Sequence, residues 1–142
     1  MSWLIFAFFT IFFYTGFDFF LKMASGKIHD GLGGFIINLV AMFVLLVFVI
    51  YSKLKGEQLI QTKTNGVLFS VIAGLFIGIA TITFIKMFAA GVNLSLGIPL
   101  VRIGIVLLAS LLGILVLKEP ISLRYIFGFL LALGGLYLLV TK

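Results

Sequence analysis

The chain has 142 residues, of which 63% are hydrophobic and 10% are charged, and its formal net charge is +6. This composition excludes a water-soluble globular domain, because a chain of this length cannot bury so much apolar surface. It contains no cysteine, which excludes disulfides and thiolate metal sites. The basic residues are scattered singly over short loops, so we expect the lipid bilayer as a partner and no nucleic acid.

A bilayer core of about 30 Å needs about 20 consecutive apolar residues for each helix. The sequence supplies five such runs, and it therefore predicts an all-α integral membrane protein with five transmembrane helices in one domain, residues 1–142. The runs are 3–21, 33–51, 66–85, 94–117 and 121–140. A single helix over residues 66–117 would be roughly 78 Å long at about 1.5 Å per residue, so two spans are required there. Gly91 and Asn93 are the expected turn residues, with Asn93 as a possible N-cap.

The first run is not typical of a signal peptide, since no basic segment precedes it, and we expect it to remain in the mature protein. Asp18 lies near its end, with Tyr14 and Lys22 four residues to either side. These three residues form one polar stripe on a helix that is otherwise crowded with phenylalanine. Asp18 could bind a cation or carry a proton, but the interpretation we favour is a local ion pair with Lys22.

Neutral polar residues occur in the next three runs. They are Asn38, Thr81, Thr83 and Ser110. Such groups can line a cavity, but more often they form hydrogen bonds between helices. The Gly74 and Gly78 pair and the face formed by Gly128, Ala132 and Gly135 permit close helix packing and need no chemical role.

Arg102 lies near the middle of the fourth run, where snorkelling to the membrane surface would be strained. Pro99, three residues earlier, has no N–H group, so the carbonyl of Ser95 loses its usual helical donor. Broken helices of this kind commonly line a cavity. Arg102 could attract an anionic substrate group, pair with Asp18, or be satisfied by the freed backbone carbonyls.

The loop charges give almost no preferred orientation. With five spans, the N-terminal face receives five basic residues and the opposite face receives four: Lys53, Lys55, Lys63, Lys118 and Arg124 against Lys22, Lys27, Lys86 and Lys142. Orientation normally follows the side that is richer in Lys and Arg. The near balance fits dual topology, in which two copies pair antiparallel, and it fits equally a fixed orientation set by partner helices or by the first span. One five-helix unit is small to enclose a pathway, so we expect a homodimer.

Two segments carry a family resemblance. Gly16 and Lys22 in YTGFDFFLKMASG look like a first-helix pattern, and Glu119 and Pro120 in LKEPISLRYIFGFLLALGG are followed by Gly128 and Gly135. On these motifs the chain resembles the EamA-type domain of the drug/metabolite transporter superfamily, in its single-domain, five-helix form. The resemblance implies one repeat unit of an inverted-repeat transporter, which exports or exchanges small metabolites, amino acids or drugs.

The leading functional hypothesis is a secondary transporter of small organic molecules in the cell membrane, working by alternating access. The expected pathway residues are Tyr14, Asp18, Asn38, Pro99 and Arg102. Because nearby cations would keep Asp18 ionised, we expect it to orient the first helix against the fourth rather than to carry protons. The alternative is a non-transporting subunit that scaffolds a partner. An enzyme is not expected, because His29 is the only histidine and no acid or base cluster accompanies it, and no cofactor or metal is implied.

Overall fold

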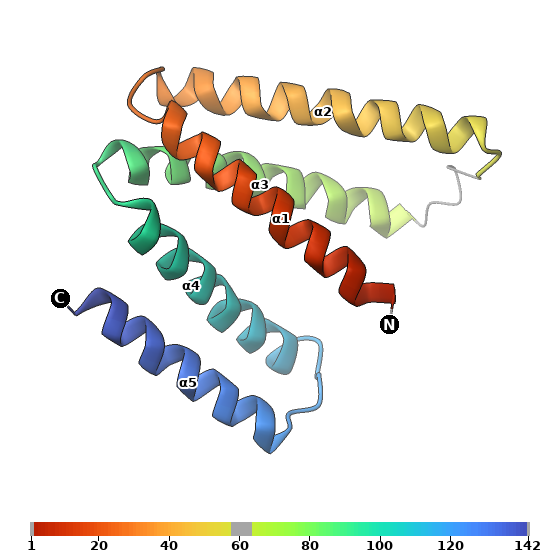
Figure 1. Ribbon diagram of the computed structural model, residues 1–142. Helices are drawn as coiled ribbons and strands as arrows, with labels where there is room; N and C mark the ends of the chain where they lie inside the picture. The colour runs from red at the N-terminus through yellow and green to blue at the C-terminus, as the bar shows by residue number, and fades with distance from the viewer. Residues whose placement is uncertain (1, 58–63, 142) are drawn as a thin grey trace. The chain divides into compact units, whose positions relative to one another are not determined.

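The structure is a computed structural model that describes residues 2–57 and 64–141. The regular structure of these residues is five α-helices: α1 (Ser2–Ala24), α2 (Asp30–Leu54), α3 (Thr64–Ala89), α4 (Leu94–Leu115) and α5 (Leu123–Val140) (Figure 1). The prediction of an all-α protein with five helices is confirmed. Residues 58–63 of the predicted polar loop, and Lys142, lie outside the described residues.

Four of the helices are long and apolar enough to cross a membrane. Their spans are Trp3–Ala24, Asp30–Leu54, Asn65–Ala89 and Leu94–Leu115. In α5 the described apolar stretch is Leu123–Gly135, which is shorter than the other four. The chain is therefore a candidate multi-pass membrane protein with four helices of spanning length and a fifth, shorter apolar helix.

The helix boundaries follow from local backbone chemistry. The turn after α1 contains Gly26 at φ 74°, and the imidazole of His29 accepts a hydrogen bond from the Gly31 N–H at 3.2 Å, which caps α2. Gly91 at φ 95° reverses the chain after α3, and Asn93 is the N-cap residue of α4. The predicted turn at Gly91 and Asn93 is confirmed. The first three helices extend beyond the predicted apolar runs because polar residues at their ends also adopt helical structure.

The turn between α4 and α5 is longer than the sequence predicted. Lys118 adopts a left-handed conformation at φ 55°, and α4 ends at Leu115 rather than at residue 117. The Ser122 hydroxyl accepts a hydrogen bond from the Tyr125 N–H at 3.2 Å, so α5 begins at Leu123 rather than at residue 121. A left-handed residue and an N-cap serine thus shorten both helices at this turn.

The helices form two compact units, Met1–Ala90 and Gly91–Lys142, which we call unit 1 and unit 2. In unit 1, α1 and α2 both pack against α3, and the packing is concentrated where α1 ends, α2 begins and α3 ends (Figure 1). We call this region the closed end of unit 1, and its buried residues are Leu21, Gly33, Gly34, Thr81, Ile85 and Phe88. In unit 2, α4 and α5 form an antiparallel pair.

Candidate functional site

The polar stripe of α1 lies on the face that meets α3. Asp18 is only 4% exposed, and buried Leu21 lies three residues further along the helix. Lys22 and Ser25 follow at the spacing that keeps all four residues on one face of a helix. The exposed Tyr14 ring lies one turn before Asp18 on this face and makes an edge contact with Phe17, with ring centroids 6.2 Å apart. The predicted stripe is therefore one helix face that contains a buried carboxylate.

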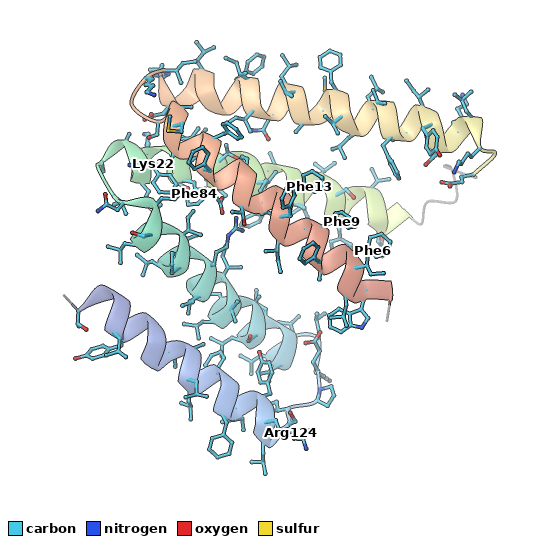
Figure 2. The ribbon with its side chains drawn as sticks, viewed as in Figure 1. Phe6, Phe9, Phe13, Lys22, Phe84 and Arg124 are labelled. Carbon is cyan, nitrogen blue, oxygen red and sulfur yellow. The ribbon has the colours of Figure 1, made fainter. Side chains whose placement is uncertain are left out.

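One side chain of α1 and one of the turn after it bind the backbone at the end of α3. The Lys22 ammonium donates to the Phe88 carbonyl at 3.3 Å, and it lies 5.2 Å from the centroid of the Phe88 ring. The Ser25 hydroxyl donates to the Ile85 carbonyl at 3.1 Å. The Phe88 carbonyl is one of the last four of α3, which lack N–H partners within the helix, so the Lys22 ammonium gives it a donor from another helix. Figure 2 shows Lys22 next to α3.

One stripe of α3 is buried at the closed end and uncovered further along the helix. Thr81, Ile85 and Phe88 are buried at the closed end. Gly74 and Gly78 continue the same stripe at helical spacing, but a Cβ atom built on either one would meet no neighbouring atom within 4 Å. These two glycines permit close packing, but they are not packed closely against another helix in the part of the chain that the structure describes.

The neutral polar residues bind within their own helices. Asn38 donates to the Gly34 carbonyl at 2.8 Å, Thr81 donates to the Ile77 carbonyl at 2.8 Å, and Thr83 bonds to carbonyls one turn earlier in α3. The expectation of bonds between helices is wrong for these three residues. In an apolar span the nearest acceptor for a short polar side chain is the carbonyl four residues earlier, which is always within reach.

Ser110 is the exception among these residues. It accepts a hydrogen bond from the Tyr125 hydroxyl, so it joins α4 to α5, and it donates to the Val106 carbonyl at 2.6 Å. At the nearby turn the Glu119 N–H donates to the Gly113 carbonyl at 3.1 Å. The Glu119 carboxylate covers buried Gly113 so closely that a Cβ there would lie 2.6 Å from Oε2. Hydrogen bonds near the turn therefore join α4 to α5 and to the connecting segment in unit 2.

Pro99 and Arg102 are half-buried and lie about one turn apart on α4. The helix continues through Pro99, so the Ser95 carbonyl lacks the N–H that any other residue would provide at position 99. Arg102 follows Leu94 by about 12 Å along the helix axis, which places its backbone deep in a span. Of the five predicted pathway residues, Tyr14, Asp18 and Asn38 belong to unit 1, whereas Pro99 and Arg102 belong to unit 2.

A small pocket of about 130 Å³ lies at the closed end of unit 1. Its lining is almost entirely apolar and comes from all three helices of the unit: Leu21, Ala24, Ser25, Ile28, Gly33, Ile36, Ile37 and Ile85. Sequence reasoning identified neither this pocket nor the roles of Ser25 and Phe88. The only local signal is the Gly33 and Gly34 pair, which lets helices approach closely. Among the described residues, no group of His, Cys, Asp and Glu side chains could hold a metal ion.

No protein-family model matches this chain, and neither a curated protein nor a solved structure is significantly similar to it. The resemblance carried by the first-helix segment and by Glu119 and Pro120 therefore stays a prediction.

Proposed function

We propose that this chain is a secondary transporter of small organic metabolites that works by alternating access as an antiparallel homodimer. The observation that carries the proposal is the buried carboxylate of Asp18, 4% exposed, on a helix of spanning length. Ionisable groups inside membrane spans are expensive and usually mark pathways for ions or substrates. Half-buried Arg102 gives unit 2 a second ionisable residue within a span.

The antiparallel homodimer is supported by the number of helices and by the loop charges. If α5 also crosses the bilayer, the termini lie on opposite faces, and an inverted second copy supplies the partner that inverted-repeat transporters contain within one chain. The five-to-four distribution of Lys and Arg allows both orientations. The uncovered glycines of α3, Gly74 and Gly78, leave room for a close helix of a second copy.

Each predicted pathway residue has a role in this proposal. Arg102 attracts an anionic group of the substrate, such as a carboxylate, beside the helix segment that Pro99 weakens. Tyr14 and Asn38 supply polar groups that contact the substrate. Asp18 positions α1 and carries no proton across the membrane, so transport is facilitated or driven by exchange. The substrates are amino-acid-like or drug-like molecules.

The experiment that tests transport is flux into liposomes that contain only the purified protein. Labelled neutral amino acids, dicarboxylic acids and quaternary ammonium ions are the probes, and we expect the zwitterionic and anionic compounds to be preferred. Arg102→Gln should lower the apparent affinity at least tenfold, because a charge-assisted hydrogen bond contributes about 1.5–3 kcal/mol. Arg124→Gln is the matched control, since Arg124 is exposed at the start of α5 (Figure 2). Equal effects of both substitutions would assign Arg102 to structure.

Coupling is tested by imposing a pH gradient on the same liposomes. We expect no accumulation of substrate in response to the gradient, either in the native protein or in Asp18→Asn. Accumulation that disappears in Asp18→Asn while downhill exchange persists would make Asp18 the coupling group and overturn this part of the proposal.

Orientation is tested with a reporter fused to the C-terminus. The reporter should appear on both sides of the membrane, and two or three added Lys residues in the loop after α2 should move that loop to the cytoplasm. A single orientation in every copy would exclude the antiparallel homodimer.

The second candidate is a non-transporting subunit that binds a partner helix, and one observation favours it. Phe6, Phe9 and Phe13 form an aromatic face along α1 and are 71%, 53% and 67% exposed (Figure 2). Large exposed aromatic faces also suit helix partners within a membrane. This candidate predicts no flux for any probe in liposomes of the purified protein, whereas the transporter predicts flux.

A further inference from the structure

The pocket of unit 1 lies where the membrane-spanning helices end. Ala24 is the last residue of α1 and lines the pocket, and Ile28 lines it from the turn that connects α1 to α2. Ser25 is its one polar lining residue, and its hydroxyl is already bonded to the Ile85 carbonyl. The ends of spans lie at the level of the lipid headgroups. The pocket is therefore an apolar recess just below the membrane surface.

Three lysines stand next to or close to lining residues of the pocket in the chain. Lys27 lies in the turn between the lining residues Ser25 and Ile28, and Lys86 follows the lining residue Ile85; both are exposed. Half-buried Lys22 adds a third cation, although its ammonium is engaged by the Phe88 carbonyl. Asp30, the first residue of α2, is an acidic residue close to this turn. Even if buried Asp18 is counted as well, this end of unit 1 keeps a net positive charge.

We propose that this pocket is a binding site for an anionic phospholipid, with part of one acyl chain in the recess and the phosphate between Lys27 and Lys86. The size of the recess fits this occupant. An engineered apolar cavity of about 150 Å³ holds one benzene molecule, so about 130 Å³ accepts a short length of one acyl chain and not a whole lipid.

The charge pattern selects the headgroup. Basic pockets between membrane helices at the level of the headgroups attract anionic lipids, and each Lys near the surface strengthens the attraction. A zwitterionic headgroup adds no net charge and gains less from the two exposed lysines. A free anion gains from the lysines but leaves the apolar recess empty. An anionic phospholipid uses both features.

The experiment compares phosphatidylglycerol with phosphatidylcholine that carries the same two acyl chains. The full chain is placed in nanodiscs that contain equal amounts of both lipids, and the lipids that stay bound after release are counted by native mass spectrometry. We expect phosphatidylglycerol to be preferred. Lys27→Gln and Lys86→Gln should each reduce the preference about fivefold. Lys53→Gln should leave it unchanged, because Lys53 is an exposed lysine of the last turn of α2.

The apolar recess is tested by filling it. Ala24→Leu places a larger side chain in the pocket, and Ile36→Phe fills it from α2, so a folding failure of one variant leaves the other. Both should reduce the retention of either lipid by at least threefold. Ala89→Leu is the control, because Ala89 is exposed at the end of α3 and does not line the pocket.

Three outcomes would overturn the proposal. Equal retention of both lipids by the native protein would remove the headgroup selectivity. Unchanged retention in Ala24→Leu and Ile36→Phe would place the acyl chain elsewhere. Displacement of phosphatidylglycerol by inorganic phosphate at equal concentration would show that the acyl chain adds nothing. The inference does not depend on transport, so an absence of substrate flux would leave it standing.

Discussion

The two ends of unit 1 use the same residue types in opposite ways. At the closed end, Leu21 and Phe88 are 3% and 2% exposed. Towards the other end of the same helices, Phe6 of α1 and Phe76 of α3 are 71% and 73% exposed. Hydrophobicity therefore does not decide which part of a membrane helix is packed. Lipid tails are as apolar as phenylalanine, so apolar side chains alone give helices no reason to associate.

Small residues and hydrogen bonds instead determine which part of each helix in unit 1 is packed. Gly33 and Gly34 let α2 approach α3, and Lys22 and Ser25 bond to carbonyls at the end of α3. At the opposite end of unit 1, which we call the open end, the Thr10 and Thr15 hydroxyls donate to carbonyls of α1 itself, those of Phe6 and Ile11. The contrast teaches that polar side chains reaching across helices mark the packed region of this unit.

The largest expected effect is at the centre of the closed end. Phe88→Ala should lower the free energy of unfolding by roughly 2 kcal/mol, below the about 3–5 kcal/mol of a soluble core because lipid solvates the unfolded side chain. Phe76→Ala, on the exposed part of the same helix, should change it by less than about 0.5 kcal/mol. Unfolding in mixed micelles measures both. Similar losses for the two variants would contradict the division into a closed and an open end.

The next effect concerns the bonds between α1 and α3. Lys22→Met keeps the length of the side chain but removes its donor, and it should cost about 1–2 kcal/mol, because hydrogen bonds between membrane helices contribute about 0.6–1.7 kcal/mol. Ser25→Ala should cost about 0.6 kcal/mol for the same reason. Lys86→Met, an exposed lysine at the same end, is the control. If the control costs as much as Lys22→Met, the loss reflects charge at the membrane surface.

A smaller effect distinguishes the two neighbouring glycines of α2. A Cβ on Gly33 would lie 3.1 Å from Cγ2 of Ile28, whereas a Cβ on Gly34 would meet its neighbours at 3.7 Å or more. Gly34→Ala should therefore be neutral or stabilise the helix by up to about 1 kcal/mol, the difference in helix propensity. Gly33→Ala should not stabilise the helix, because its new methyl group crowds Ile28. The double variant Gly33→Ala with Ile28→Ala should be more stable than expected from the two single variants, because the crowding is removed. Thermal unfolding of the single and double variants measures the order of their stabilities.

The smallest effect on the folding of one chain is expected on the open stripe of α3. Gly74→Leu and Gly78→Leu should not lower the unfolding free energy, because a Cβ at either position meets nothing within 4 Å and leucine is a better helix former than glycine. Crosslinking in nanodiscs then tests association. Loss of a crosslinked dimer with unchanged folding would assign this stripe to a second copy, whereas a large loss of stability would show that the stripe is packed within the chain.

The sequence was sufficient to predict the helices, because a bilayer requires long apolar segments and short polar turns between them. Gly91 and Asn93 were identifiable as a turn from their residue types. The closed end was not predictable, since Leu21 and Phe20 are equally apolar and only the first is buried. The role of Ser25 was not predictable either, because its acceptor lies 60 residues away in the chain.

Within the candidate site, the shared face of Tyr14, Asp18 and Lys22 followed from helical spacing alone. The hydrogen bonds of Asn38 and Thr81 did not follow from spacing, because each side chain donates to a carbonyl of its own helix rather than to a neighbouring helix. Spacing predicts which side chains share a face, but it does not predict which acceptor lies nearest in space.

The bonds that close unit 1 join residues far apart in the chain, and this has a consequence for biosynthesis. Ser25 and Lys22 precede their acceptors by 60 and 66 residues. At about 5–20 residues per second, a ribosome needs roughly 3–12 s to make the segment between Ser25 and Ile85. Throughout that interval α1 is already made and α2 is being completed, and the Lys22 ammonium must be solvated by water, lipid headgroups or the insertion machinery. Unit 1 therefore closes only when α3 arrives, whereas the α4–α5 hairpin needs only contacts between neighbouring helices.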